Sequence, residues 1–133
     1  MTDTEAYELG RRALAAGFQW RPGCVAVSSR EKYGPAVYLC ADYDGKPMFC
    51  CLSPGAEPAA YDNMAPDVRD PGVIGHMWAQ LAERAGTHIE IRRSSDGAGW
   101  SVGPQDGIHS DFVGMESRDL SHALVAALEM TAG

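Results

Sequence analysis

The stretch DPGVIGHMWAQLAERAGTHIEIRR, residues 70–93, has the clearest structural pattern in the chain. Asp70 followed by Pro71 marks a helix start, because Asp caps a helix and Pro fits its first turn. Gly86 is a typical helix end. Between these ends, apolar residues recur at the spacing of one helix face: Ile74, Met77, Trp78, Leu81, Ala82 and Ala85. In residues 88–93 the isoleucines alternate with polar residues, which predicts a half-buried strand after the helix.

Towards the C-terminus, the pattern predicts a second strand and a last helix. Asp96 and Gly97 form a turn signal, and the strand that follows contains Trp100 and Val102. Residues 103–114 are rich in glycine and polar residues, with Ile108, Phe112 and Val113 as candidate contacts of a further short strand. We expect Ser117 to cap a helix with a continuous apolar stripe: Leu120, Ala123, Leu124, Ala127 and Leu128.

Towards the N-terminus, the sequence predicts a helix and three strands. Thr2 and Glu5 form a capping-box pattern, which indicates a helix over residues 3–16. The strands are expected at residues 24–29, 36–43 and 46–53. Asp44-Gly45 between the last two is a strong signal for a β-hairpin with a two-residue loop.

A two-residue loop fixes the pairing of this hairpin, so that Tyr43 faces Lys46, Ala41 faces Met48 and Leu39 faces Cys50. Apolar residues then lie on both faces. One face carries Val37, Leu39, Ala41, Met48, Cys50 and Leu52, and the other carries Tyr38, Cys40, Phe49 and Cys51. Either both faces are covered by the protein or one face contacts a partner.

The predicted element order is α-β-β-β-α-β-β-(β)-α, which indicates an α+β fold with three helices packed on antiparallel sheet. We expect residues 1–133 to form a single domain with one shared core, because either half alone would have a marginal core. An N-terminal αβββ part covers about residues 1–53, and a C-terminal αββ(β)α part covers residues 70–133. The Pro-rich connection over residues 54–69 shows no hydrophobic period. We expect three tryptophans to face the core: Trp20, Trp78 and Trp100.

The charge is acidic, with 18 acidic and 11 basic residues and a net charge of −7. A protein that binds the phosphate backbone needs clustered Lys and Arg, so this balance argues against direct nucleic-acid binding. The excess acids in residues 42–70 indicate either a solvated surface or a patch that fits a basic partner. No uncharged stretch is long enough to cross a membrane, and the N-terminus lacks the pattern of a signal peptide. We therefore expect a cytoplasmic protein.

The four cysteines and four histidines show no spacing typical of a metal site or a catalytic motif. We expect Cys24, Cys40, Cys50 and Cys51 to be packing residues in a reducing cytosol, with no cofactor, no metal and no catalytic residue. Two alternatives stay open, namely a zinc site that uses Cys24, Cys40 and Cys51, and a Cys–His dyad formed in space. Asp42 and Asp44 share a strand face and could bind a cation weakly, although Asp beside a turn is common for conformational reasons.

Most of the chain resembles a group of small bacteriophage and prophage proteins known as phage ABA-sandwich-like. The resemblance rests on MAPDVRDPGVIGHMWAQLAERAG (64–86), HIEIRR (88–93), GWSVG (99–103) and SRDLSHALVAALEM (117–130). ELGRRALAAGFQWRPGC (8–24) resembles the N-terminal helix and turn of longer members. The resemblance implies a small accessory phage protein in the host cell cytosol, and it implies no reaction and no catalytic residues.

These observations predict a non-enzymatic accessory protein that binds another protein through an acidic surface. The expected partner is a host or defence protein, one version being an anti-CRISPR-like inhibitor that covers a basic nucleic-acid-binding surface. The residues expected to contact the partner lie in the hairpin tip and the Pro-rich connection: Asp42, Asp44, Glu57, Tyr61, Asp62 and Asp67. Two alternatives are a small Cys/His-based hydrolase or metal-dependent enzyme, and a homodimer that pairs through the second face of the hairpin.

Overall fold

A computed structural model describes residues 1–29, 36–42, 46–52, 55, 57–93, 97–104, 115–117 and 119–132. Its elements are α1 (Asp3–Ala15), β1 (Val25–Ser28), β2 (Ala36–Asp42), β3 (Lys46–Cys51), β4 (Met64–Pro66), α2 (Pro71–Ala85), β5 (Ile89–Arg93), β6 (Trp100–Pro104), β7 (Met115–Ser117) and α3 (Leu120–Thr131). The predicted α+β class is confirmed. Ile108, Phe112 and Val113 lie outside the described residues.

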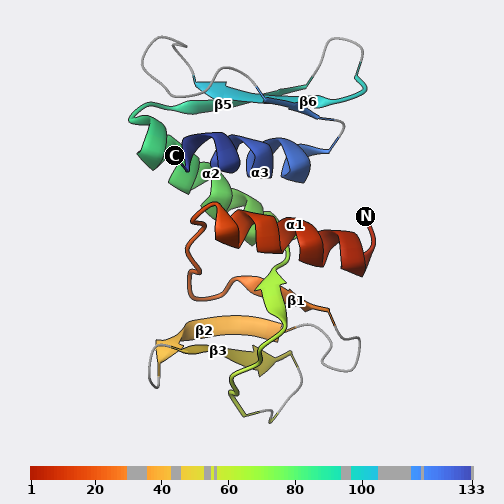
Figure 1. The fold of residues 1–133 in the computed structure, drawn as a ribbon, viewed down its shortest axis with the longest axis vertical. Coiled ribbons are helices and arrows are strands. Elements are labelled where there is room, and N and C mark those ends of the chain that lie inside the picture. Colours follow the sequence, from red (N-terminus) through yellow and green to blue (C-terminus); the bar gives the residue numbers. More distant parts are fainter. Residues whose placement is uncertain are drawn as a thin grey trace.

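The strands form two antiparallel sheets rather than one. The first sheet has the order β3-β2-β1-β4, and the second has the order β5-β6-β7. Figure 1 shows the helices as a middle layer, with β1–β3 at one end of the molecule and β5 and β6 at the other. Each sheet therefore turns one face towards the helices.

One hydrophobic core joins both halves of the chain. A single cluster of buried residues includes Leu9 and Phe49 from the N-terminal part together with Leu81, Val102 and Leu124 from the C-terminal part. All three helices contribute large side chains to this cluster. Buried side chains of both parts of the chain therefore pack in the same cluster.

The helix ends follow from local capping. The Thr2 hydroxyl accepts a hydrogen bond from the Glu5 backbone N–H at 3.1 Å, as the capping-box pattern predicts. The Asp70 carboxylate accepts bonds from the backbone N–H groups at the start of α2, and Gly86 ends that helix with a φ of 68°. The predicted cap of α3 was wrong, because Asp119 rather than Ser117 occupies it. Ser117 belongs to β7 instead.

The Pro-rich connection contains a strand that the sequence pattern did not predict. Residues 64–66 form β4, which is buried and pairs with β1. α1 packs so closely on β4 that a Cβ atom on Gly10 would lie 2.3 Å from the carbonyl oxygen of Pro66. A three-residue strand is too short to show a hydrophobic period, so its position depends on this tertiary contact.

The pairing predicted for the hairpin was wrong. Asp42 rather than Tyr43 pairs with Lys46, so three residues separate the two strands instead of two. The register also shifts between Tyr38 and Cys40, so that Cys40 pairs with Met48. Such a bulge inserts one extra residue into a strand and changes every pairing beyond it, which an alternating pattern cannot reveal.

The buried face of α2 is rotated from the predicted one. Trp78 was expected in the core, but 42% of it is exposed, and its indole N–H donates to the Ile89 carbonyl at 3.0 Å. Gln80 takes a buried position because its amide bonds both the backbone N–H and the carbonyl of Gln19, each at 3.0 Å. Hydrogen bonding to the backbone compensates the burial of a polar group, whereas Trp78 stays at the surface. Trp20 and Trp100 are half-buried.

Candidate functional site

The most exposed apolar side chains of the first sheet lie on one face of β2 and β3. Tyr38 and Phe49 point into the core, and alternate residues of a strand point to opposite faces. The opposite face exposes Leu39 by 39%, and Leu52 just beyond β3 is exposed by 62%. We define the hairpin surface as these two leucines, the half-buried residues beside them and two nearby exposed acids: Leu39, Leu52, Val37, Met48, Cys50, Glu57 and Asp62.

The edge of β3 next to this surface is already occupied in part. β3 lies at one end of the strand order of its sheet and is therefore an edge strand. Phe49 and Ala59 exchange two backbone hydrogen bonds of 2.8 and 2.7 Å, so the chain around Ala59 lies along this edge. Pro47 has no N–H to offer a further strand. The face of the hairpin is therefore more open to a partner than its edge.

Two of the predicted acidic residues lie in the segment that runs along the edge of β3. Glu57 is two residues from Ala59, and Asp62 follows shortly after; Figure 1 shows this part of the chain beside β3. Both residues are exposed, and within the described part of the chain neither has a hydrogen-bond or ion-pair partner. Asp42 ends β2 opposite Lys46. Asp44 lies outside the described residues.

Tyr61, another predicted partner-binding residue, is half-buried in an aromatic cluster. Its ring lies 6.5 Å from that of Phe49, and its hydroxyl is 3.9 Å from the sulfur of Cys51. Trp20 packs against Phe49 with a centroid distance of 5.2 Å. Tyr61 thus helps to cover the inner face of the hairpin, and only part of its side chain can reach a partner.

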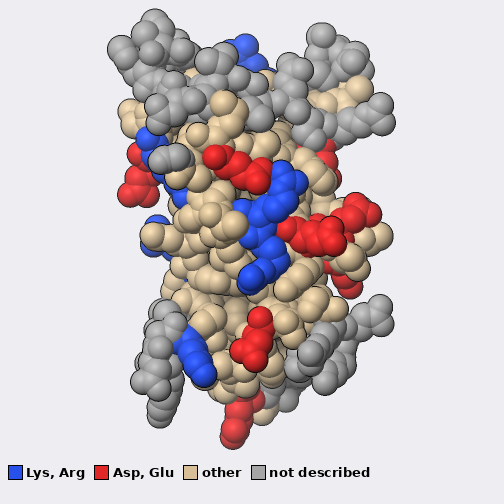
Figure 2. Space-filling view, viewed as in Figure 1, with Lys and Arg blue, Asp and Glu red and all other residues tan. Residues whose placement is uncertain are grey.

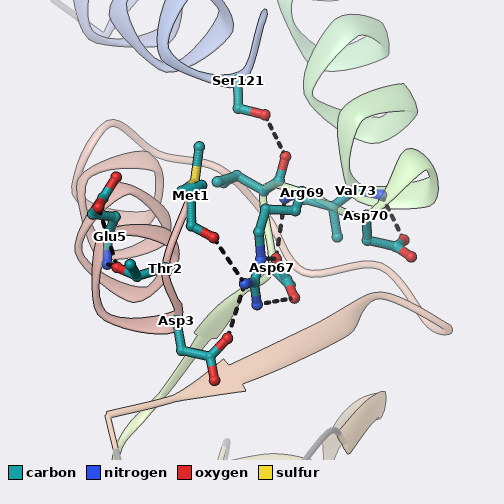
Figure 3. Close-up of polar contacts among 10 residues, drawn as sticks. Met1, Thr2, Asp3, Glu5, Asp67, Arg69, Asp70, Val73 and Ser121 are labelled. Carbon is teal, nitrogen blue, oxygen red and sulfur yellow. Dashed lines mark hydrogen bonds and ion pairs between the residues drawn. The ribbon is translucent and has the colours of Figure 1, made fainter. Parts of the chain in front are cut away.

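Asp67, another predicted partner-binding residue, forms an ion pair within the chain. Figure 3 shows Arg69 between Asp67 and Asp3. The guanidinium donates to both carboxylate oxygens of Asp67, each at 2.9 Å, and to Asp3 at 2.8 Å. The hydrogen bonds to Asp67 raise the pKa of Arg69 above its ordinary value, with Asp3 adding to the effect. The three residues connect the start of α1 to the segment that leads into α2.

Charges of both signs share the face of the molecule seen in Figure 2. Acidic and basic side chains lie next to each other around α1, and at the end that holds β1–β3 they are separated by uncharged atoms. On this view, the acidic excess forms no continuous patch.

The structure bears on the alternatives of an activated thiol and a metal site only through the described residues. Burial raises the pKa of the Cys24 thiol, which is the opposite of what a nucleophile needs. The Cys50 thiol donates to the neighbouring Cys51 carbonyl at 3.6 Å. Among the described residues, no group of three or more His, Cys, Asp or Glu side chains could hold a metal ion. His109 and the side chain of Cys40 lie outside the described part of the structure.

Sequence reasoning named Leu39 and Leu52 as residues of one hairpin face but did not include them among the partner-binding residues. The signal was present in part, since apolar residues on both faces of the hairpin left open that one face contacts a partner. No helix within the described ranges is long and apolar enough to cross a membrane. Comparisons with protein-family models, with curated proteins and with solved structures find no match.

Proposed function

We propose that this chain is a non-catalytic binding protein that recognises a basic surface of another protein through the hairpin surface. The observation that carries the proposal is the exposure of Leu39 and Leu52 on the sheet face that points away from the core. Full burial of a leucine side chain contributes about 1.5–3 kcal/mol, so covering the exposed part of Leu52 would contribute about 1–2 kcal/mol. Such groups form the centre of an interface, with polar groups at its rim.

The charge supports a basic partner. The chain has a net charge of −7, and Glu57 and Asp62, in the segment along the edge of β3, have no internal cation to pair with among the described residues. Complementary charges at a rim guide the approach of a partner and set its orientation. A partner would pack on the face of the hairpin rather than extend the sheet, because Ala59 and Pro47 already limit the edge of β3.

The resemblance to phage accessory proteins supports a biological setting for this binding. In that setting the partner is a host or defence protein, and a basic surface that normally holds nucleic acid is one that an acidic protein would cover. An inhibitor of the anti-CRISPR kind is the most specific form of the proposal.

Affinity capture from a bacterial extract tests the proposal. Three baits are compared: the wild-type chain, a Glu57→Lys and Asp62→Lys double variant, and a Glu8→Lys and Glu83→Lys double variant as a control. The control changes the net charge equally at exposed positions on α1 and α2. We expect a basic protein on the wild-type and control baits that is depleted on the hairpin bait and released by salt. Equal recovery on the hairpin bait, or no recovery on any bait, would contradict the proposal.

The apolar part of the surface has its own test. Leu52→Ser removes the most exposed large apolar side chain, which lies just outside β3. It should weaken binding of the captured protein several-fold without changing how strongly the affinity depends on salt. Circular dichroism of the variant checks that the fold is retained.

A further inference from the structure

The strand β5 forms one edge of the second sheet, at the end of the molecule opposite the hairpin surface. It runs over five residues from Ile89 to Arg93, and among the described strands it pairs only with β6. The unpaired backbone groups of an edge strand can form hydrogen bonds with a strand of another molecule. What such a strand would have to look like follows from the residues of β5.

Pro104 determines which backbone groups of β5 point away from β6. It lies opposite Ile89 and has no N–H, so these two residues cannot form a hydrogen-bonded pair. Hydrogen-bonded and non-hydrogen-bonded pairs alternate along an antiparallel ladder. The backbone groups of Glu90 and Arg92 therefore point towards β6. Those of Ile89 and Ile91 point outwards, to the open side of the strand.

The contact between α2 and β5 agrees with this direction. The indole N–H of Trp78 donates to the Ile89 carbonyl at 3.0 Å, so that carbonyl is directed away from β6. Ile91 is the next outward residue, and within the described part of the chain its backbone N–H and carbonyl have no hydrogen-bond partner. Trp78, which is 42% exposed, lies beside this edge, and an added strand would cover part of it.

The side chains on either side of Ile91 carry opposite charges. Glu90 and Arg92 lie on the same face of β5 and form an ion pair of 2.6 Å, although 73% of the Arg92 side chain is exposed. In an antiparallel pair of two β5 strands centred on Ile91, Glu90 of each copy lies opposite Arg92 of the other copy. Opposite charges directly across a strand pair are stabilising, and like charges are destabilising.

This charge order selects a second copy of the chain as the occupant of the edge. Pairs centred on Glu90 or on Arg92 would place like charges opposite each other, whereas the pair centred on Ile91 matches the charges at both positions. Two-fold symmetry then forms each favourable contact twice. We propose that β5 is a self-association edge, at which two copies of this chain pair antiparallel about Ile91 and join their second sheets.

The oligomeric state of the wild-type chain tests this proposal independently of the hairpin surface. Pairing of two five-residue strands buries less than the about 1,200 Å² of a standard interface, so we expect a weak dimer with a Kd of about 10–500 µM. Sedimentation over this range should show the mass rising from 14.2 kDa towards twice that value. A chain that stays at 14.2 kDa throughout the range would overturn the proposal.

Charge variants test the register. Glu90→Arg and Arg92→Glu each place like charges across the strand pair, and each should raise the dimer Kd at least about tenfold. A mixture of these two variants should form a heterodimer, because every facing pair is then of opposite charge. The variant that carries both changes should regain the wild-type Kd. Arg11→Glu makes the same change of charge at an exposed position of α1 and should leave the dimer unchanged.

The pattern of these variants decides between this edge and any other interface. Dimers that persist in both single variants, or a mixture that stays monomeric, would overturn the proposal. Amide hydrogen exchange gives a second measurement, since the Ile91 N–H should exchange more slowly as the protein concentration rises. The Glu90 N–H, which points towards β6, should be protected at every concentration. An Ile91 exchange rate that stays constant while the chain dimerises would place the interface elsewhere and overturn the proposal.

Discussion

Gly10→Ala sets two well-understood effects against each other. In the interior of a helix, alanine is favoured over glycine by about 1 kcal/mol, so helix propensity alone predicts a more stable protein. The structure predicts the reverse, because the new Cβ atom would lie 2.3 Å from the Pro66 carbonyl oxygen and 3.0 Å from the Ala65 Cβ atom. The backbone of Pro66 cannot easily move, since β4 pairs with β1 and the Asp67 N–H donates to Val25.

Overpacking of this kind costs about 1–3 kcal/mol, and contact with a fixed carbonyl belongs at the upper end of that range. After the gain of about 1 kcal/mol in propensity, Gly10→Ala should lower the free energy of unfolding by about 2 kcal/mol. Gly75→Ala is the matched control, because the same change at an open position of α2 should raise it by about 1 kcal/mol. Urea denaturation followed by circular dichroism measures both values. If Gly10→Ala gained stability as Gly75→Ala does, the close packing of α1 on β4 would be refuted.

Three further changes test the caps and buried polar groups. Asp70→Ala removes the N-cap of α2 and should lower the free energy of unfolding by about 1 kcal/mol in urea denaturation. An unchanged denaturation midpoint would show that the Asp70 side chain does not stabilise α2 as a cap. Gln80→Leu leaves the backbone groups of Gln19 without their partner and should cost about 1–3 kcal/mol in the same assay; a stabilised variant would show that these bonds contribute little. Burial raises the pKa of the Cys24 thiol in the folded protein. Above about pH 8.5 the unfolded chain therefore loses a proton that the folded chain keeps. The free energy of unfolding should fall as the pH rises through this range. Cys24→Ala should remove that part of the fall, and an identical pH profile would contradict the assignment.

The helices could be predicted from the sequence because their signals are local. Asp70 and Gly86 mark the two ends of α2, and the apolar stripe of α3 matches its buried residues. The rotation of α2 could not be predicted in this way. Hydrophobicity places Trp78 in the core and Gln80 outside, whereas the bonds from Gln80 to the Gln19 backbone reverse that order.

The candidate site was predictable only in part, for a similar reason. Glu57 and Asp62 were expected at the surface and lie there. Asp67 looked equally free in the sequence, although Arg69 lies two residues away and binds it. The bulge near Leu39 and the strand β4 both depend on contacts between distant parts of the chain, and such contacts leave no repeating pattern in a short segment.

The most direct test of recognition through the hairpin surface is the salt dependence of affinity for the purified basic protein captured by the wild-type chain. Titration calorimetry at increasing salt should show affinity that falls steadily for the wild type. The Glu57→Lys and Asp62→Lys variant should bind more weakly and show a smaller dependence on salt. An affinity that is independent of salt, or that is equal in the two proteins, would contradict recognition at this surface.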